Sequence, residues 1–316
     1  MTRAGGRDHG GGVDAAAARH GGARADWLDM STGINPRPYP VGGVDARAWT
    51  DLPDAGAEAA FVDAARAFWG VPDGADVLPA PGASALIARL PALLPAARVV
   101  IPGPTYNEHV AAFRAHGWDV VETGPAEAFV AVHPNNPDGR LWGAGDLPDV
   151  ALTVIDESFC DVMPEVSLTP LAVRPGVVIL KSFGKFWGLA GLRLGASIGA
   201  PDTLARLAEM LGPWPVSGPA LEIGMRALRD LDWAAATRAR LVDNADRLDT
   251  LMTGTGAEVL GGTALFRLYA VADAAAVADR LAQARILVRT FPYNPRWLRL
   301  GLPGDSEDWA RLEAAL

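Results

Sequence analysis

Short apolar segments alternate with amphipathic segments along the middle of the chain. The apolar segments predict strands at residues 98–101, 119–122, 128–133, 152–155, 177–180 and 196–199. Apolar residues recur at helical spacing at 57–69, 107–116 and 203–211, which predicts helices there. Strands that alternate with helices favour an α/β fold with a largely parallel sheet covered on both faces.

The pattern changes near residue 212. A Gly-Pro-Trp-Pro sequence from Gly212 to Pro215 interrupts it and is a candidate hinge. A nearly continuous helix is expected from about residue 219 to 252, and then a compact α/β unit with strands at 258–260, 264–271, 286–290 and 297–300 and helices at 274–284 and 305–316. We therefore expect an N-terminal arm and loop at 1–45, a large domain at 46–215 and a small domain at 216–316.

The first residues differ in character from the rest. Residues 1–26 are rich in Gly, Ala and charge, which indicates a flexible arm with one short helix at 14–20. A short apolar strand then breaks into Ser31, Thr32, Gly33 and Asn35, and prolines at 36, 38 and 40 stiffen the chain that follows. Such a stiff polar segment suits a loop over a pocket.

Small residues separate an apolar strand at 77–80 from a helix predicted at 85–94. Gly82, Ala83 and Ser84 would offer backbone N–H groups and a hydroxyl to an anion at the start of this helix. A simple helix cap explains the same residues.

Composition limits the partners and the chemistry. The chain has 316 residues, half of them hydrophobic, and a net charge of −9. This charge argues against nucleic acid and against an anionic membrane surface as partners. A single cysteine, Cys160, excludes an intramolecular disulfide and a cysteine-based metal site, and we expect it to be a buried apolar residue. No apolar run is long enough to span a bilayer and no secretory signal is visible, so we expect a cytoplasmic protein.

Polar side chains follow several of the predicted strands. Tyr106, Asn136, Asp156 and Lys185 each come shortly after one, where the binding crevice of a parallel sheet lies. A carboxylate at Asp156 is costly to bury unless it meets a cation. A lysine at the end of a buried strand has a depressed pKa and can form a Schiff base with an aldehyde. Taken singly, these motifs also fit a β-turn or a solvated lysine, but their order along the chain favours one site.

Four motifs together resemble the fold-type I pyridoxal-phosphate enzymes of the class I/II aminotransferase superfamily. They are Pro-Asn-Asn-Pro-x-Gly from Pro134, Asp-Glu-Ser-Phe from Asp156, Ser-Phe-Gly-Lys ending at Lys185, and Gly-Leu-Arg-Leu-Gly around Arg193. Within this superfamily, the His-Gly-Gly sequence at His9, the segment 27–36 and Asp-Glu-Ser-Phe are similar to the threonine-phosphate decarboxylases of cobalamin biosynthesis. The resemblance implies a three-layer αβα large domain with a mostly parallel sheet, plus a smaller α/β C-terminal domain.

The resemblance implies pyridoxal 5'-phosphate (PLP) as the cofactor. Lys185 would bind PLP as a Schiff base and then act as the proton-transfer group. Asp156 would pair with the ring nitrogen, Asn136 would donate a hydrogen bond to the ring oxygen, and Tyr106 would stack on the ring. The cofactor phosphate would be held by a set of small residues and one arginine, namely Gly82, Ala83, Ser84, Ser182 and Arg193.

The resemblance also implies substrate-binding residues. Arg299 would bind the α-carboxylate as a bidentate fork, and Arg289 would bind the substrate phosphate. A pair of solvated strand arginines is the alternative. The substrate side would be closed by a group of N-terminal residues: Thr32, Gly33, Asn35 and, if the arm folds over, His9.

Two positions depart from the pattern of the aminotransferases. Phe159 stands where they usually have a tyrosine whose hydroxyl reaches the ring oxygen, which fits the decarboxylase branch better. Leu52 stands where a tyrosine often reaches the cofactor phosphate of the second subunit, so this contact is not expected here. The resemblance still implies a homodimer.

The implied activity is that of a lyase acting on a small phosphorylated amino acid. L-threonine O-3-phosphate would lose CO₂ and give (R)-1-amino-2-propanol O-2-phosphate. The alternative is an aminotransferase of a phosphorylated substrate such as histidinol phosphate, because the orientation of the bonds at Cα is not visible in a sequence. The intact set of Lys185, Asp156, Asn136 and Arg193 argues against a non-catalytic binding protein with this fold.

Overall fold

The computed structural model describes residues 9–316, which form two compact units. The large unit contains residues 38–136 and 140–236, and the small unit contains the residues up to Arg37, residues 137–139 and residues 237–316. The boundary expected at 215/216 lies instead at 236/237, because α7 (Gly218–Arg229) packs on α3 (Ala55–Trp69) of the large unit. Residues 1–8 of the expected arm lie outside the described residues.

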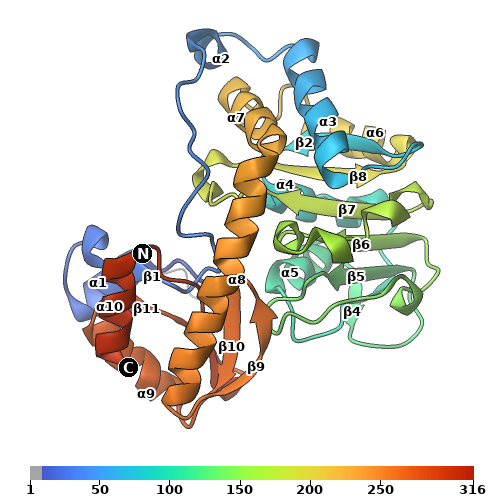
Figure 1. The fold of residues 1–316 in the computed structure, drawn as a ribbon. Coiled ribbons are helices and arrows are strands. Elements are labelled where there is room, and N and C mark those ends of the chain that lie inside the picture. The colour runs from blue at the N-terminus through green and yellow to red at the C-terminus, as the bar shows by residue number, and fades with distance from the viewer. Residues whose placement is uncertain (1–8) are drawn as a thin grey trace. The chain divides into compact units, whose positions relative to one another are not determined.

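In the described chain, the large unit is built on a seven-stranded sheet (Figure 1). Its strands follow the spatial order β2-β8-β7-β6-β5-β3-β4. Strand β8 runs antiparallel to both neighbours, whereas β3 to β7 are parallel to one another. The bounds are β2 (Asp76–Ala80), β3 (Arg98–Val100), β4 (Asp119–Val121), β5 (Ala128–Val132), β6 (Leu152–Asp156), β7 (Val177–Ser182) and β8 (Gly195–Gly199). The mostly parallel sheet predicted from the sequence is confirmed, and the carboxyl ends of β3 to β7 share one edge.

Both faces of this sheet are buried. Helices α4 (Ala83–Ile87), α5 (Asn107–Ala115) and α6 (Pro201–Leu211) pack on one face, where Leu86 and Phe113 meet alternate strand residues such as Val154. The residues between these alternate ones point to the opposite face. There Phe129 packs with the partly buried Trp142. Because the sheet is covered on both sides, residues on both faces of its central strands are buried. This explains why these strands are apolar along their length instead of alternating with polar residues.

The small unit holds a second, antiparallel sheet in the order β12-β13-β10-β9. Its strands are β9 (Glu258–Thr263), β10 (Phe266–Ala270), β12 (Arg289–Phe291) and β13 (Asn294–Leu300), and β1 (Leu28–Asp29) pairs in parallel with β11 (Ile286–Leu287). Its helices are α1 (Val13–His20), α9 (Ala274–Gln283) and α10 (Ser306–Ala315). Helix α2 (Ala46–Thr50) belongs to the large unit, and α8 (Leu231–Gly254) begins there and ends in the small unit.

Residues 137–139 belong to the small unit because their backbone packs on β9. The Gly262 N–H donates to the Asp138 carbonyl at 2.9 Å. A Cβ atom on Gly139 would lie 2.1 Å from the Gly262 carbonyl oxygen, so only glycine permits this approach. The chain therefore leaves the large unit directly after Asn136 and returns to it at Arg140.

Two helices that the sequence predicts as continuous are each interrupted. The helix predicted at 85–94 consists of α4 and a separate 3-10 turn (Leu90–Leu93), because Pro91 has no N–H for a continuous helix. The helix predicted at 219–252 is divided into α7 and α8 at Asp230, whose carboxylate accepts the Trp233 N–H at 3.0 Å and caps α8. None of the described helices combines the length and the apolar character that crossing a membrane requires.

Candidate active site

A cavity of about 210 Å³ lies in the large unit at the edge where the parallel strands end. All nine residues predicted to contact the cofactor line it: Gly82, Ala83, Ser84, Tyr106, Asn136, Asp156, Ser182, Lys185 and Arg193. Apolar walls are added by residues such as Ile87, Val132 and Phe159. The structure thus brings together side chains that are more than a hundred residues apart in the sequence.

One end of the cavity is suited to an anion. Gly82 has a φ of +83°, and a Cβ atom there would lie 2.8 Å from Arg193 Nη2, so the guanidinium lies directly against the glycine. Arg193 is itself left-handed, with a φ of 53°, and its Nη1 donates to the Ala190 carbonyl at 3.0 Å. The N–H groups of Ala83 and Ser84 lie in the first turn of α4, where a helix has no internal acceptor for them. A fixed cation and these N–H groups form one anion-binding end.

The carboxylate of Asp156 lies at the end of β6, where it is buried and hydrogen-bonded to His109 and Ser158. Its Oδ2 is 2.8 Å from His109 Nε2, and its Oδ1 accepts from the Ser158 hydroxyl at 2.6 Å and from the Ser158 N–H at 3.0 Å. Burial alone would raise the pKa of Asp156, but the hydrogen bonds from His109 and Ser158 outweigh it and lower that pKa. Asp156 is therefore held as a carboxylate and can stabilise a positive charge in the cavity.

The chain contains two lysines, and only one of them lines the cavity. Lys181 is 2% exposed and forms a buried ion pair with Glu157. Burial would lower the pKa of Lys181, but Glu157 and Asp161 outweigh it and raise that pKa, so this amine stays protonated. Lys185 is half-buried in the loop after β7, with its Nζ 5.2 Å from the centre of the Phe159 ring. Lys185 is therefore the lysine that places an amine at the cavity.

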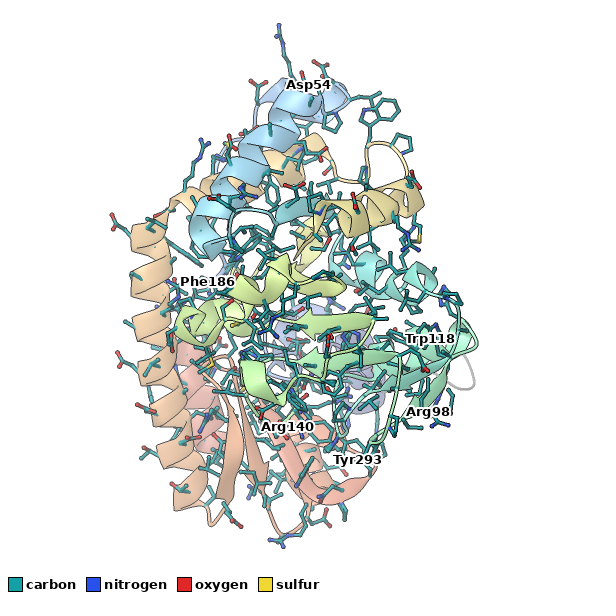
Figure 2. All side chains as sticks on the ribbon, turned by 90° about the vertical axis from the view of Figure 1, so that its right-hand side faces the viewer. Asp54, Arg98, Trp118, Arg140, Phe186 and Tyr293 are labelled. Atoms are coloured by element: carbon teal, nitrogen blue, oxygen red, sulfur yellow. The ribbon has the colours of Figure 1, made fainter. Side chains whose placement is uncertain are left out.

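An aromatic cluster fixes the loop that carries Lys185. Trp187 is stacked between Phe183, at 5.8 Å, and Trp233, at 5.3 Å between ring centroids. Its indole N–H donates to Asp161 Oδ2 at 3.0 Å, and the Phe186 ring packs edge-on against it at 5.0 Å. Figure 2 labels Phe186. Contacts on both sides of Lys185 in the sequence therefore hold its backbone in place.

A second group of chemically active side chains lies next to this site and serves the core. His133, Glu157 and Cys160 come within 4.8 Å of one another, close enough to suggest a metal site. However, His133 Nδ1 accepts from the Trp142 N–H and its Nε2 donates to the Val166 carbonyl. Glu157 forms an ion pair with Lys181. Burial raises the pKa of the Cys160 thiol, and the negative charge of Glu157 raises it further. These donors are committed to internal interactions, and Cys160 is a buried apolar residue as expected.

The two predicted substrate arginines lie opposite each other in the small unit. Arg289 on β12 and Arg299 on β13 are register partners in the antiparallel ladder. Arg299 is 4% exposed, with its Cζ 5.1 Å from the centre of the Phe266 ring. Like charges placed directly across a ladder repel each other. An anion bound to this pair would remove the repulsion.

The other predicted substrate residues also belong to the small unit. Asn35 is buried, and its side-chain oxygen accepts from the Arg37 N–H at 3.0 Å and from Arg240 Nη2 at 3.1 Å. Asn35 therefore has a structural task in the loop. Thr32 is partly buried and Gly33 is buried with a φ of 63°, whereas His9 is exposed.

Comparison with known proteins decides the family. The model of the aminotransferases of class I and II matches residues 44–316. The chain belongs to this family.

Two proteins similar to this chain over almost its whole length are decarboxylases. The threonine-phosphate decarboxylase of a Sinorhizobium species is 42% identical to it over 98% of this chain and 97% of that protein. The threonine-phosphate decarboxylase of Pseudomonas aeruginosa is 41% identical over the same shares. Among solved structures, the histidinol-phosphate aminotransferase from Sinorhizobium meliloti in complex with pyridoxal-5'-phosphate has a TM-score of 0.85 at 20% identity, covering 100% of this chain and 97% of that chain. This structural likeness confirms the fold.

Sequence reasoning missed His109 and Ser158 in this aminotransferase-family site. His109 lies in the first turn of α5, three residues after the N-cap residue Tyr106, and the two ring centroids are 6.1 Å apart. The spacing from Tyr106 was therefore the signal that could have found it. Ser158 follows Asp156 by two residues, the spacing at which a side chain and its neighbouring backbone commonly bond. Both residues bond to Asp156, and Ser158 also lines the cavity.

Proposed function

We propose that this protein is a PLP-dependent carboxy-lyase that converts L-threonine O-3-phosphate to (R)-1-amino-2-propanol O-2-phosphate and CO₂, a step of cobalamin biosynthesis. The observation that carries this proposal is the match of almost the whole chain to threonine-phosphate decarboxylases at above 40% identity. The chemistry of the cavity and of the paired arginines supports it independently.

The side chains of the cavity fit PLP. A cation and first-turn N–H groups suit its phosphate, the ionised Asp156 suits its protonated ring nitrogen, and the amine of Lys185 suits its aldehyde. Asn136 would donate to the ring oxygen and Tyr106 would pack on the ring. When bound, PLP supplies an electron sink for the electron pair released at the substrate Cα.

The protein's own residues would bind the substrate and move one proton. Arg299 would hold the α-carboxylate and Arg289 the phosphate, which also neutralises two guanidiniums that face each other across the ladder. The bond from Cα to the carboxylate carbon breaks, CO₂ leaves, and the electron pair stays at Cα. Lys185 would then deliver a proton from Nζ to Cα, which completes the amine product.

Phe159 supports decarboxylation over transamination. Its ring lines the cavity and is 4% exposed, and it carries no hydroxyl that could donate to the ring oxygen of the cofactor. A tyrosine at this position would add such a donor.

The activity is tested with purified protein, PLP and L-threonine O-3-phosphate, without any keto acid. We expect steady release of CO₂ over many turnovers, with one equivalent of phosphorylated amino-propanol per CO₂. A strict requirement for 2-oxoglutarate would instead identify an aminotransferase.

We also propose that the protein is a homodimer. In the described part of the large unit, several large apolar side chains are exposed: Trp49 by 70%, Leu52 by 66% and Trp214 by 58%. Leu52 lines one hollow and Trp214 lines a second, and both hollows share Pro53, Asp54 and Leu221. Asp54 caps α3 at this end (Figure 2). Contiguous exposed apolar surface of this kind marks an interaction site, and a second copy is the occupant that the resemblance implies.

The dimer is expected to depend on this surface. Light scattering after gel filtration should give the mass of two chains, and Trp49→Asp should shift the population toward one chain by placing a charge in the interface. Leu260→Asp, at an exposed position of the small unit, is the matched control and should leave the mass unchanged. A monomeric wild-type protein would contradict the proposal.

A further inference from the structure

We propose that Ser31, clamped by the docked segment Gly10–Gly11, is a positioning residue for Arg299 and thereby sets the affinity for the substrate carboxylate. This inference rests on the proposed function, in which Arg299 binds that carboxylate. It gives a role to the His-Gly-Gly sequence beyond any contact made by His9.

Ser31 is held from both sides within the small unit. It is 2% exposed, and its hydroxyl donates to Asp29 Oδ1 at 2.6 Å, as does its N–H at 2.9 Å. The same hydroxyl oxygen accepts the Gly11 N–H at 2.7 Å. The backbone N–H and the hydroxyl of Ser31 are therefore both hydrogen-bonded, and these bonds fix the direction of its carbonyl.

That carbonyl is the element of Ser31 that reaches the substrate arginine. Arg299 Nη2 donates to the Ser31 oxygen, and the guanidinium lies over the Phe266 ring. The neighbouring Met30 carbonyl accepts the Gly301 N–H at 2.6 Å, which ties this segment to the end of β13. A guanidinium is a rigid planar fork, so fixing one of its nitrogens fixes the direction in which the remaining N–H groups point.

Gly10 packs directly against the backbone of Ser31. A Cβ atom at Gly10 would lie 2.4 Å from the Ser31 carbonyl oxygen and 2.9 Å from its carbon, both backbone atoms. A side chain there must therefore displace either the N-terminal segment or the carbonyl that binds Arg299. Gly12 provides a matched comparison, because a Cβ there would have nothing within 4 Å and its φ is −82°.

The experiment compares Gly10→Ala with Gly12→Ala in the PLP-loaded protein. Two ligands separate the effects: L-threonine O-3-phosphate carries the carboxylate, and (R)-1-amino-2-propanol O-2-phosphate lacks it. We expect Gly10→Ala to raise KM for L-threonine O-3-phosphate about tenfold, because a misdirected hydrogen bond to a charged group loses about that factor in affinity. The inhibition constant of (R)-1-amino-2-propanol O-2-phosphate should not change. Gly12→Ala should match the wild type for both ligands.

Two further variants keep the outcome interpretable. Ser31→Ala removes the hydroxyl links but no steric contact, and it should reproduce the carboxylate-specific loss at a smaller size. Arg299→Lys should weaken the carboxylate-bearing ligand without weakening the other. Equal loss of both ligands in Gly10→Ala, or no loss in it, overturns the inference. Absence of CO₂ release by the wild type would overturn the proposed function instead.

Discussion

Replacing Lys185 by alanine is expected to abolish covalent attachment of PLP and to lower turnover by about a thousandfold or more, because the variant has neither the amine nor the proton donor. Borohydride reduction of the wild-type protein should fix one phosphopyridoxyl group on the peptide that contains Lys185, and the absorption band of the attached cofactor should vanish in the variant. A modified Lys181, or a variant that keeps its activity, would contradict this assignment.

Lys181 provides the internal control for this experiment. It is the other lysine of the chain, four residues away, and it is buried against Glu157. Lys181→Met should leave an unpaired carboxylate in the core and destabilise the protein by about 3–5 kcal/mol. Its melting temperature should fall while the cofactor remains attached, which separates a stability effect from a chemical one.

Asp156→Asn is expected to lower kcat by about a hundredfold or more while PLP remains attached to Lys185, because an amide cannot hold the proton on the ring nitrogen of the cofactor. The cofactor absorption band at Lys185 reports attachment, and steady-state turnover reports the loss. Unchanged turnover in this variant would remove Asp156 from the proposed mechanism.

His109 extends the same prediction to pH. In the folded protein the pKa of Asp156 is lowered from 3.8, so its ionised form stabilises the fold above that value and the contribution is lost as the pH falls through the lowered pKa. His109→Leu removes the largest cause that lowers the pKa of Asp156 and leaves only the Ser158 hydrogen bonds to oppose burial. That pKa should therefore rise, and acid inactivation should begin at a higher pH. His109→Gln keeps an N–H for Asp156 and should restore most of the wild-type profile. Identical acid limbs in all three proteins would show that His109 has no such role.

The sequence was sufficient to assemble the cavity because its residues follow the ends of parallel strands. Asp156 and Ser182 are the last residues of β6 and β7, and Asn136 lies shortly past the end of β5. Parallel strands bring such positions to one edge of the sheet. Gly82 and Arg193 entered the predicted site through the resemblance to the pyridoxal-phosphate enzymes, and the structure shows the guanidinium lying against the glycine.

What the sequence could not supply depends on three-dimensional packing. The division at Asp230 depends on a local cap, and the extent of the large unit depends on α7 packing against α3. The Asn35 oxygen accepts from Arg240, which lies 205 residues further along the chain, and no local pattern indicates this contact. The role of Asn35 at the substrate stays a prediction. Gly10 and Ser31 meet only when the N-terminal segment folds back, which no local pattern indicates.

The scarcity of lysine makes the folded large unit resistant to a lysine-specific protease. The chain offers such an enzyme two peptide bonds, one inside β7 between two neighbouring strands and one in the loop that Trp187 holds. A protease needs several residues in an extended and accessible form, so cleavage must wait for this part of the sheet to open. The rate of appearance of the cut chain is therefore a direct measure of how often the large unit opens, and bound cofactor should slow it.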